Sequence, residues 1–412
     1  LVTVPLYVAD RPENVAHVLQ DSGAKLLLID NATHWHPLHE ACAGISTLQR
    51  IVTLRTPPEG DNDERLRGVD EWLPDTHDGK HHLYDDPDRL ATIVYTSGTT
   101  GRSKGVMLSH RNLLSNADGA MQCFTVYTHD LFLSFLPLSH CLERTAGYYV
   151  PMMCGATVAY ARSVQQLQED LAQVRPTVLI TVPRIFERVQ SGIRSKLDKG
   201  PASARRLFDL TVEVGHHRFE HRQRRARWHP KLLMWPLLKR LVADKVTARL
   251  GGRLRIAVSG GAPLSADNAR TFIGLGLHIL QGYGLSETSP VISVNREHAN
   301  LPSSVGLKLP NLEVRLGEHD ALEVRGPSVM LGYWNNEEAT RAMFTTDGWL
   351  NTGDVARIDA NGHITITGRI KEIIVLSNGE KVPPSDMEAA ILADPLFEQV
   401  MVVGEGRAYL GL

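Results

Sequence analysis

Short apolar runs alternate with stretches of helical periodicity along most of this chain. The runs are bounded by turn residues and occur at 25–29, 90–95, 130–136, 177–182 and 254–259. Apolar positions recur at helical spacing over 11–21, 164–174 and 265–275. Strands that alternate with helices are typical of α/β folds with parallel sheets. We therefore predict an α/β fold whose large N-terminal domain contains layered mixed or parallel sheets with helices.

Two stretches depart from this alternation. Residues 184–250 have few strand signals and many Arg, Lys and Leu, which predicts helices broken at Gly200–Pro201, Pro230 and Pro236. From about residue 301, short strands with turn residues predict a small β-rich subdomain.

These changes of pattern suggest domain limits. We predict a large domain over 1–368, with a basic helical insert at 184–250 and a β-rich subdomain at 301–368. Residues 369–412 would begin a small α+β C-terminal domain. Because the chain starts at Leu1 and stops within a strand-like run, we expect it to be a fragment cut at both ends.

Charge and cysteine content narrow the classes of function. A net charge of −2 argues against a dedicated nucleic-acid binder, yet residues 184–255 carry 19 Lys and Arg against 6 Asp and Glu, an excess of 13. Four cysteines without a CxxC pair indicate a reducing compartment. No apolar run reaches the ~20 residues of a spanning helix. We expect a cytoplasmic protein, with peripheral contact at the inner face of the membrane as an alternative.

The strongest local signal is the segment from Tyr95 to Val106, YTSGTTGRSKGV. An apolar strand runs into a loop of glycines and hydroxyls with one lysine, which suits an anion such as phosphate. The candidate phosphate-binding residues are Thr96, Ser97, Gly98, Thr99, Thr100, Gly101 and Lys104. The loop lacks the Gly-Lys-Ser/Thr of a Walker A motif, which disfavours a P-loop kinase or GTPase.

This segment resembles the phosphate-binding signature of the adenylate-forming superfamily, which contains acyl-CoA synthetases, luciferases and adenylation domains. Further motifs follow in the family's order. SGGAPL at 259–264 is similar to the glycine turn that lies against adenine and the acyl group, through Gly261 and Ala262. QGYGLSET at 281–288 resembles the next motif, with candidate nucleotide-binding residues Gln281, Gly282, Tyr283, Gly284 and Thr288.

The resemblance implies individual roles. Tyr283 would stack on adenine, Asp354 in NTGD would accept the ribose hydroxyls, and Arg369 would reach ribose or phosphate. Glu287, together with Thr96, would hold Mg²⁺. Lys371 falls at the hinge on which the small domain swings, and His140 in LPLSH would line the approach of the acyl group and the thiol. Lys104, Glu287, His140 and Lys371 are thus the candidate catalytic residues.

The insert at 184–250 and the sequence PLSHCLER at 137–144 resemble the corresponding segments of long-chain fatty acyl-CoA synthetases. That implies ATP-dependent ligation of a long-chain fatty acid to coenzyme A through an acyl-adenylate. One alternative is an acyl-AMP ligase that delivers to a carrier protein. Another is a non-catalytic ATP-binding or membrane-docking relative. The expected partners are the fatty acid, ATP, Mg²⁺ and coenzyme A, with no nucleic acid. Peripheral membrane contact through the basic insert is a further candidate, because its cations stand beside aromatic and aliphatic residues, and a solvated helix face is the alternative. The oligomeric state, a homodimer included, is left open.

Two expectations depend on these assignments. The loop around Lys104 and the carboxylate of Glu287 should converge on one triphosphate. The family also uses a lysine late in the small domain, which nothing here matches, so we expect this chain to bind ATP but to form the adenylate poorly. A zinc site at His34, His36 and His39 is disfavoured, because no cysteine and no carboxylate except Glu40 completes it.

Overall fold

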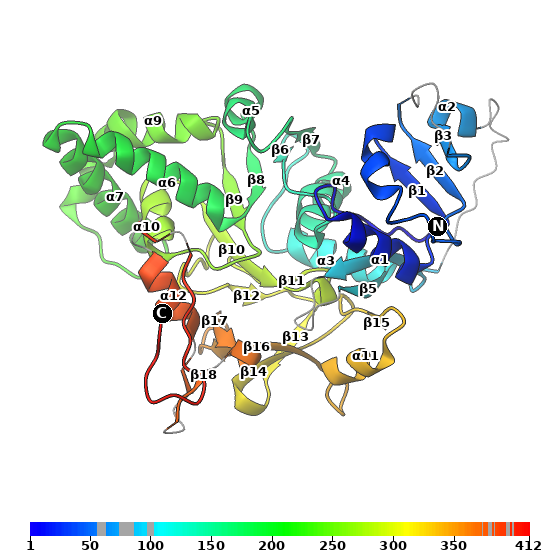
Figure 1. Cartoon of the computed structure of the whole chain (residues 1–412). Coiled ribbons are helices and arrows are strands. Elements are labelled where there is room, and N and C mark those ends of the chain that lie inside the picture. Colours follow the sequence, from blue (N-terminus) through cyan, green and yellow to red (C-terminus); the bar gives the residue numbers. More distant parts are fainter. Residues whose placement is uncertain are drawn as a thin grey trace. The chain divides into compact units, whose positions relative to one another are not determined.

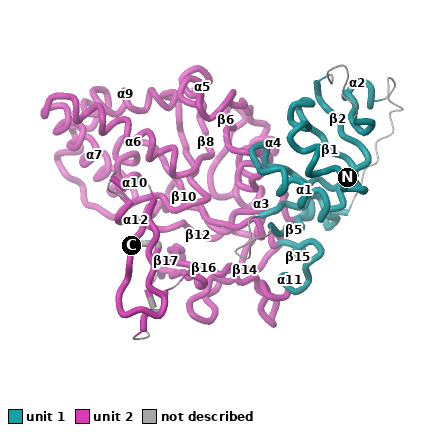
Figure 2. The backbone as a smooth tube through the Cα atoms, viewed as in Figure 1, with its two compact units in different colours: residues 1–111, 330–340 teal, residues 112–329, 341–412 magenta. Residues whose placement is uncertain are grey.

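The computed structural model describes residues 1–55, 63–73, 86–96, 103–372, 374–377, 381–382, 384–392, 396–397 and 399–412. The chain forms two compact units, which Figure 2 shows in different colours. Unit 1 consists of Leu1–Arg111 and Met330–Thr340, and unit 2 of Asn112–Val329 and Arg341–Leu412. The predicted domain limit at residue 368 is a different division and stays a prediction.

Unit 1 contains two small sheets. The parallel sheet has the order β1-β2-β3, with strands Leu26–Ile29, Arg50–Thr53 and Leu66–Gly68. The antiparallel sheet has the order β15-β5-β4, with strands Gly332–Tyr333, Lys104–Ser109 and Leu90–Thr96. The helical elements are α1 (Pro12–Ser22), η1 (Ala32–His34), η2 (His36–Leu38) and α2 (Val69–Trp72). Buried Trp35, Leu19 and Ile51 belong to the core of this unit.

The largest sheet among the described residues lies in unit 2 and has seven strands. Its order is β12-β11-β10-β9-β8-β6-β7, with strands Leu307–Lys308, Val291–Val294, Ile279–Gly284, Ile256–Ser259, Val178–Thr181, Leu131–Ser134 and Thr157–Tyr160. The strands from β10 to β7 are parallel to one another, and β11 and β12 are added antiparallel. The carboxyl ends of the parallel strands therefore share one edge.

Alternate residues of the central strands face opposite sides of this sheet. One side packs against helices through Leu133, Leu179, Ala257 and Ile279. The helical elements on this side, mostly green in Figure 1, are α5 (Leu167–Val174), α6 (Pro183–Asp198), α7 (Ala202–Arg222), η4 (Pro230–Met234), α8 (Trp235–Leu238), η5 (Lys239–Ala243), α9 (Asp244–Thr247), η6 (Ala248–Leu250) and α10 (Ala266–Gly274).

The opposite side of the sheet packs in a second core through Phe132, Val178, Ile180, Ile256 and Leu280. That core includes residues of an antiparallel sheet in the order β13-β14-β16-β17, with strands Glu313–Leu316, Ala321–Arg325, Leu350–Ile358 and Ile364–Arg369. The other helical elements that belong to this unit, wholly or in part, are α3 (His110–Met121), η3 (Glu143–Tyr149), α4 (Val150–Cys154), η7 (Ser286–Thr288), η8 (Glu318–Asp320) and α11 (Glu337–Met343). The last elements are η9 (Ile370–Glu372), β18 (Ile374–Val375), β19 (Lys381–Val382) and α12 (Pro384–Leu392).

Helices α7 and α10 cross with their backbones in contact. A Cβ added at Gly215 of α7 would lie 1.8 Å from the carbonyl oxygen of Gly274 in α10, and one at Gly274 would lie 2.5 Å from that of Val212. Only glycine allows so close an approach at these positions. The basic helical insert is therefore built into the core of unit 2.

The structure confirms the α/β fold, the β-rich segment after residue 301 and the predicted helix break at Gly200–Pro201. The predicted break at Pro236 is wrong. The chain stays helical there, because Pro236 lies in the first turn of α8, where a missing N–H is tolerated. No helix in the described part of the chain is long and apolar enough to cross a bilayer.

Candidate active site

A row of polar side chains lies at the carboxyl edge of the seven-stranded sheet. Thr181, Ser259 and Gln281 are partners in register across β8, β9 and β10, so their side chains point to the same side. All three are buried, and within the described residues Ser259 Oγ has no hydrogen-bond partner. Ligands of open α/β sheets bind outside the carboxyl ends of the strands. This edge is therefore the candidate site.

The turn after β9 carries two of the predicted residues, Gly261 and Ala262. Gly261 has a φ of +79°, a left-handed conformation that glycine adopts without strain. Gln281 Oε1 accepts a hydrogen bond from Leu264 N at 3.3 Å and so ties the turn to β10. Both Gly261 and Ala262 are exposed, which leaves their backbone open to a ligand.

Tyr283, Asp354 and Arg369 come from three different strands and meet at one carboxylate. The hydroxyl of Tyr283 donates to Asp354 Oδ2, and Arg369 Nε donates to Asp354 Oδ1 at 2.9 Å. Asp354 and Arg369 are also cross-strand partners in β16 and β17. Burial and the charge of Asp354 raise the pKa of Tyr283 well above its usual value, so the phenol stays protonated. Three residues predicted separately for adenine and ribose are thus hydrogen-bonded together.

The residues before Asp354 hold its backbone in place. Thr352 Oγ1 donates to Leu322 O at 2.8 Å and accepts from Asp354 N at 3.2 Å. Gly353, between them, has a φ of +74°, which explains why the predicted motif has glycine there. The Thr-Gly-Asp sequence therefore fixes the direction of a buried carboxylate.

Glu287 lies half-buried in the short helix η7, directly after β10. The next residue, Thr288, is fully buried, and its hydroxyl donates to Pro290 O at 2.6 Å. Asn116 of α3 stabilises this turn, because its amide nitrogen donates to Thr288 O at 3.0 Å and to Val291 O at 2.8 Å. The assignment of Thr288 to a phosphate stays a prediction, because its hydroxyl already serves the turn.

Gly282 and Gly284 stand on either side of Tyr283 in β10. A Cβ added at Gly284 would lie 1.8 Å from Pro290 O, so the turn that carries Glu287 closes directly onto the strand. At Gly282 the nearest atom would be Ser293 O at 3.3 Å. Glycine at both positions thus lets β11 approach the backbone beside Tyr283.

His140 directly precedes the helical segment that starts at Cys141 and continues into η3. Its Nδ1 accepts a hydrogen bond from Leu142 N at 3.2 Å, so the neutral ring carries its proton on Nε2. His140 is exposed, yet the surrounding protein lowers its pKa by desolvation. Burial raises the pKa of Cys141, and Ser286 and Glu287 also affect it, which puts this segment beside the η7 turn. His140 can thus offer an uncharged imidazole near the site.

Glu143, the first residue of the π-helix η3, is buried with 1% of its surface exposed. Neither carboxylate oxygen has a hydrogen-bond partner among the described residues. Burial raises the pKa of Glu143 to about 7. The nearby Ser134 hydroxyl lowers this pKa in part, although the two side chains do not have the geometry of a hydrogen bond. A Cβ at Gly147 would lie 2.4 Å from Glu143 Oε1, so the glycine leaves room for this carboxyl.

The predicted phosphate-binding loop belongs to unit 1. Ser97, Gly98, Thr99, Thr100 and Gly101 lie outside the described residues. Thr96 and Lys104, which flank the loop, are partners in register at the ends of antiparallel β4 and β5. The Lys104 ammonium lies 5.3 Å from the ring centroid of Tyr333, in a cation–π contact. A strand, rather than the helix of a P-loop, therefore follows the lysine.

Arg369 ends β17, and Lys371 lies two residues later in the short helix η9, exposed to solvent. An exposed side chain directly after the last strand of the β-rich sheet is consistent with a connection between domains. The hinge role of Lys371 stays a prediction.

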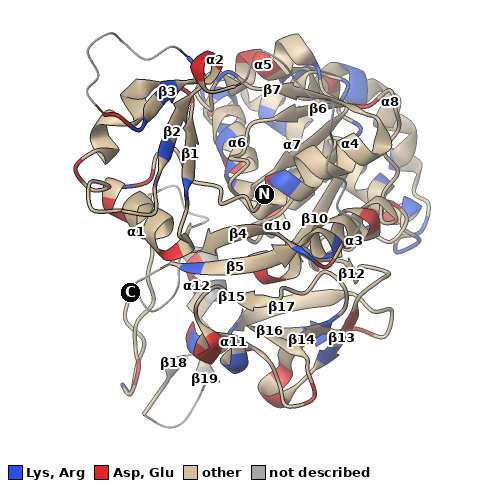
Figure 3. Ribbon diagram, turned by 90° about the vertical axis from the view of Figure 1, so that its right-hand side faces the viewer, with Lys and Arg blue, Asp and Glu red and all other residues tan. Residues whose placement is uncertain are grey.

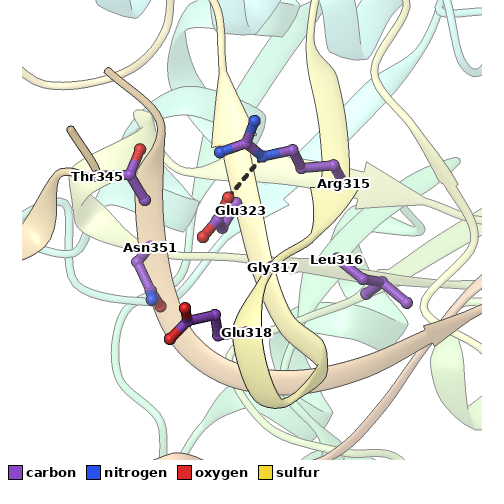
Figure 4. A pocket seen from close by; sticks show the side chains of 7 residues that line it. All are labelled: Arg315, Leu316, Gly317, Glu318, Glu323, Thr345 and Asn351. Atoms are coloured by element: carbon purple, nitrogen blue, oxygen red, sulfur yellow. Dashed lines mark hydrogen bonds and ion pairs between the residues drawn. The ribbon is translucent and has the colours of Figure 1, made fainter. Parts of the chain in front are cut away.

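A separate pocket of about 470 Å³ opens beside the β13–β14 hairpin (Figure 4). Arg315 donates to Glu323 Oε2 at 2.6 Å and to Asp347 Oδ2 at 2.7 Å. Thr345 and Asn351 also line it. None of the residues predicted from the sequence lies in this pocket, and its central charges are paired within the protein, so we assign it no ligand.

The residues that support the site were not predicted from the sequence. Asn116 holds the Glu287 turn, and Asn112, one helical turn earlier, donates to Pro327 O at 2.8 Å and Val329 O at 2.9 Å. Two asparagines four residues apart share a helix face with apolar Leu113 and Ala117, which are buried. That pattern of polar residues on an otherwise buried face was the available signal.

Comparison with known proteins gives a consistent result. A family model described as AMP-binding enzyme matches residues 1–334, and one described as AMP-binding enzyme C-terminal domain matches residues 371–412. Long-chain-fatty-acid–CoA ligase FadD15 of Mycobacterium bovis is 35% identical over 415 residues, which cover 100% of this chain and 68% of the relative. Long-chain-fatty-acid–[acyl-carrier-protein] ligase AEE15 of Arabidopsis thaliana is 32% identical over 372 residues, 79% of this chain and 51% of the relative. ATP-bound MatB from Rhodopseudomonas palustris superposes with a TM-score of 0.73 at 25% identity, over 98% of this chain and 70% of MatB.

Proposed function

The chain belongs to the AMP-binding enzyme family, and we propose that it joins a long-chain fatty acid to coenzyme A through an acyl-adenylate. ATP would supply the adenylate, with pyrophosphate released in the first step and AMP in the second. The observation that carries this proposal is the meeting of Tyr283, Asp354 and Arg369 at one buried carboxylate.

In the proposed complex these three residues recognise the nucleoside. The ring of Tyr283 offers a face for adenine, and Asp354 accepts hydrogen bonds from the ribose hydroxyls. A carboxylate has about four acceptor positions, so Asp354 keeps capacity for ribose while it holds the Tyr283 hydroxyl and Arg369. Arg369, whose guanidinium is half-exposed, adds a positive charge for ribose or phosphate.

The triphosphate would be bound by cations and hydroxyls. Lys104 would supply a positive charge and Thr96 a hydroxyl donor. Glu287 would hold Mg²⁺, an ion that usually takes one or two carboxylates together with phosphate oxygens. The described residues contain no group of three His, Cys, Asp or Glu arranged as a metal site, which fits an ion shared with the nucleotide. Bound there, Mg²⁺ would neutralise phosphate charge.

The reaction needs positioning more than a strong base. In step one a fatty carboxylate oxygen bonds to the α-phosphorus and pyrophosphate leaves. In step two the thiol sulfur of coenzyme A bonds to the acyl carbonyl, AMP leaves and the thiol proton is lost. Neutral His140 is our candidate to accept that proton at Nδ1, once the bond from Leu142 N opens. Lys371 is our candidate for the hinge between the two steps.

Two observations support a long-chain acid as the substrate. The helical insert from α6 to η6 separates β8 from β9, where the sequence resembles long-chain synthetases. The relative FadD15 also carries a long-chain fatty acid in its name. The name of AEE15 keeps a second candidate open, which is transfer to an acyl carrier protein.

The proposal is tested by binding and by transfer. We expect a non-hydrolysable palmitoyl-adenylate mimic to bind, and to bind more tightly than an acetyl-adenylate mimic, in isothermal titration calorimetry. Asp354→Asn should weaken binding at least tenfold, about 1.4 kcal/mol. Asp209→Asn, at an exposed position of α7, is the matched control and should bind normally. Equal affinity of wild type and Asp354→Asn would contradict the proposed nucleoside site.

The acceptor is tested with the same protein. Palmitate and ATP are incubated with either coenzyme A or acyl carrier protein, and the products are analysed by mass spectrometry. Release of palmitoyl-CoA supports the ligase. Acyl transfer to the carrier protein alone would replace it with the second candidate.

A further inference from the structure

The helical segment from η4 to η6, residues 230–250, has two different faces. Its inner face is buried, with Trp235, Leu238 and Leu250 in the core between the helices and the seven-stranded sheet. Its outer face carries Leu233, Leu237 and Leu241, which are 74%, 61% and 42% exposed. Because these leucines are four residues apart, they lie along one side of the helical path. Met234 extends this outer apolar face, and it too is exposed.

This segment is held firmly to unit 2. The ring of Trp235 lies against α7, where the Arg218 guanidinium is 5.2 Å from its centroid. A Cβ added at Gly215 would come within 2.5 Å of the same ring. The exposed leucines therefore belong to a fixed surface. A monomeric soluble protein seldom exposes a contiguous apolar patch with a polar rim unless the patch binds something.

Exposed cations are frequent in this segment and in the residues just before it. Residues 221–250 contain nine Lys and Arg and one acidic residue, Asp244. Arg225, Lys231 and Lys239 form ion pairs with Glu220, Glu213 and Asp244. No carboxylate of the described residues pairs with the remaining six, which are all exposed: Arg222, Arg224, Arg227, Arg240, Lys245 and Arg249. Figure 3 marks Lys and Arg in blue on the ribbon.

We propose that the outer apolar face and its six cations dock this protein on the anionic surface of a lipid bilayer. Interfacial helices combine leucines that enter the headgroup region with Lys and Arg that bind anionic lipids. A second copy of the chain fits less well, because a symmetric contact would bring the same positive surface against itself. A nucleic acid would match the charge and leave the leucines in water. The inference rests on the proposed function, since long-chain fatty acids partition into bilayers.

The first experiment measures vesicle binding. Protein is sedimented with vesicles of phosphatidylcholine alone or of phosphatidylcholine with phosphatidylglycerol, at low and at high salt. We expect binding to the anionic vesicles that weakens as salt rises, because each basic residue near the surface is worth on the order of fivefold in partition. Absence of binding to anionic vesicles at low salt would overturn the proposal.

Two sets of variants separate the apolar and the charged contributions. Leu233→Ser, Leu237→Ser and Leu241→Ser combined should lower partition at least tenfold. Leu114→Ser with Leu316→Ser, at exposed leucines elsewhere in unit 2, is the matched control and should bind like wild type. Arg224→Gln, Arg227→Gln and Arg240→Gln combined should remove most of the salt dependence. Equal loss in the control, or wild-type binding by either test set, would refute the docking face.

Two further readouts keep the interpretation clear. Affinity for the palmitoyl-adenylate mimic, measured without vesicles, should be unchanged in every variant, so a failure of membrane docking is distinct from a failure of the proposed enzyme. The mass of the protein in solution should not fall in the leucine variant. A dimer that dissociates in that variant would assign the face to a second copy and overturn the membrane proposal.

Discussion

The buried carboxyl of Glu143 should make the stability of the protein depend on pH. Its pKa is raised from 4.5 to about 7, chiefly by burial. At about 1.4 kcal/mol per tenfold change in proton affinity, ionisation of this group costs the folded protein about 3 kcal/mol. Because the folded state binds the proton more tightly than the unfolded state, this stability is present below pH 4.5. It is lost as pH rises to about 7, and the loss then levels off.

The substitution Glu143→Gln removes the titration and keeps the shape of the side chain. A buried amide without partners carries a cost of its own, but that cost is the same at every pH. We expect the free energy of unfolding of Glu143→Gln, relative to wild type, to increase by roughly 2–3 kcal/mol between pH 5 and pH 9. Most of the increase should occur below pH 7.

Urea-induced unfolding at a series of pH values measures this difference. Glu187→Gln, at an exposed position of α6, is the matched control and should differ from wild type by a constant amount. Infrared difference spectra add a direct readout, a protonated carboxyl band that titrates near pH 7 and is missing in Glu143→Gln. Parallel stability curves for Glu143→Gln and wild type would refute the reasoning.

Gly215→Ala should destabilise the protein by about 3 kcal/mol or more, because the added methyl group would meet the carbonyl of α10. Gly192→Ala, where nothing lies within 4 Å, should be neutral or stabilising in the same urea titrations. Asn116→Ala should lower stability by about 1–3 kcal/mol and weaken Mg²⁺-dependent ATP binding, since two carbonyls around Glu287 lose their donor; unchanged ATP affinity in calorimetry would limit its role to folding. Tyr283→Phe should keep most of the affinity for AMP, while Tyr283→Ala should lower this affinity at least about tenfold, as expected if the ring stacks on adenine. A larger loss of affinity in Tyr283→Phe than in Tyr283→Ala would disprove the stacking role.

Much of the fold was predictable because it depends on local pattern. The apolar runs at 177–182 and 254–259 became the buried strands β8 and β9, and Gly200–Pro201 separates α6 from α7. Pro236 was misread because a proline has the same sequence signature in the first turn of a helix as in a break. Only the surrounding packing of Trp235 and Leu238 settles which occurs.

The site was predictable in its residues more than in its contacts. Tyr283, Asp354 and Arg369 were named from separate motifs, and their meeting depends on the pairing of β16 with β17 and the approach of β10. The burial of Glu143 could not be foreseen, because an isolated glutamate in a sequence is most often exposed. It follows from the packing of a π-helix, which no local sequence pattern identifies.

The crossing of α7 and α10 makes two distant parts of unit 2 move as one. At Gly215 and Gly274 the backbones of the two helices touch, so a shift of one helix towards the other has to be followed by its partner. Helix α10 starts at Ala266, shortly after the turn that exposes Gly261 and Ala262. A displacement of the insert would therefore be passed on to that turn.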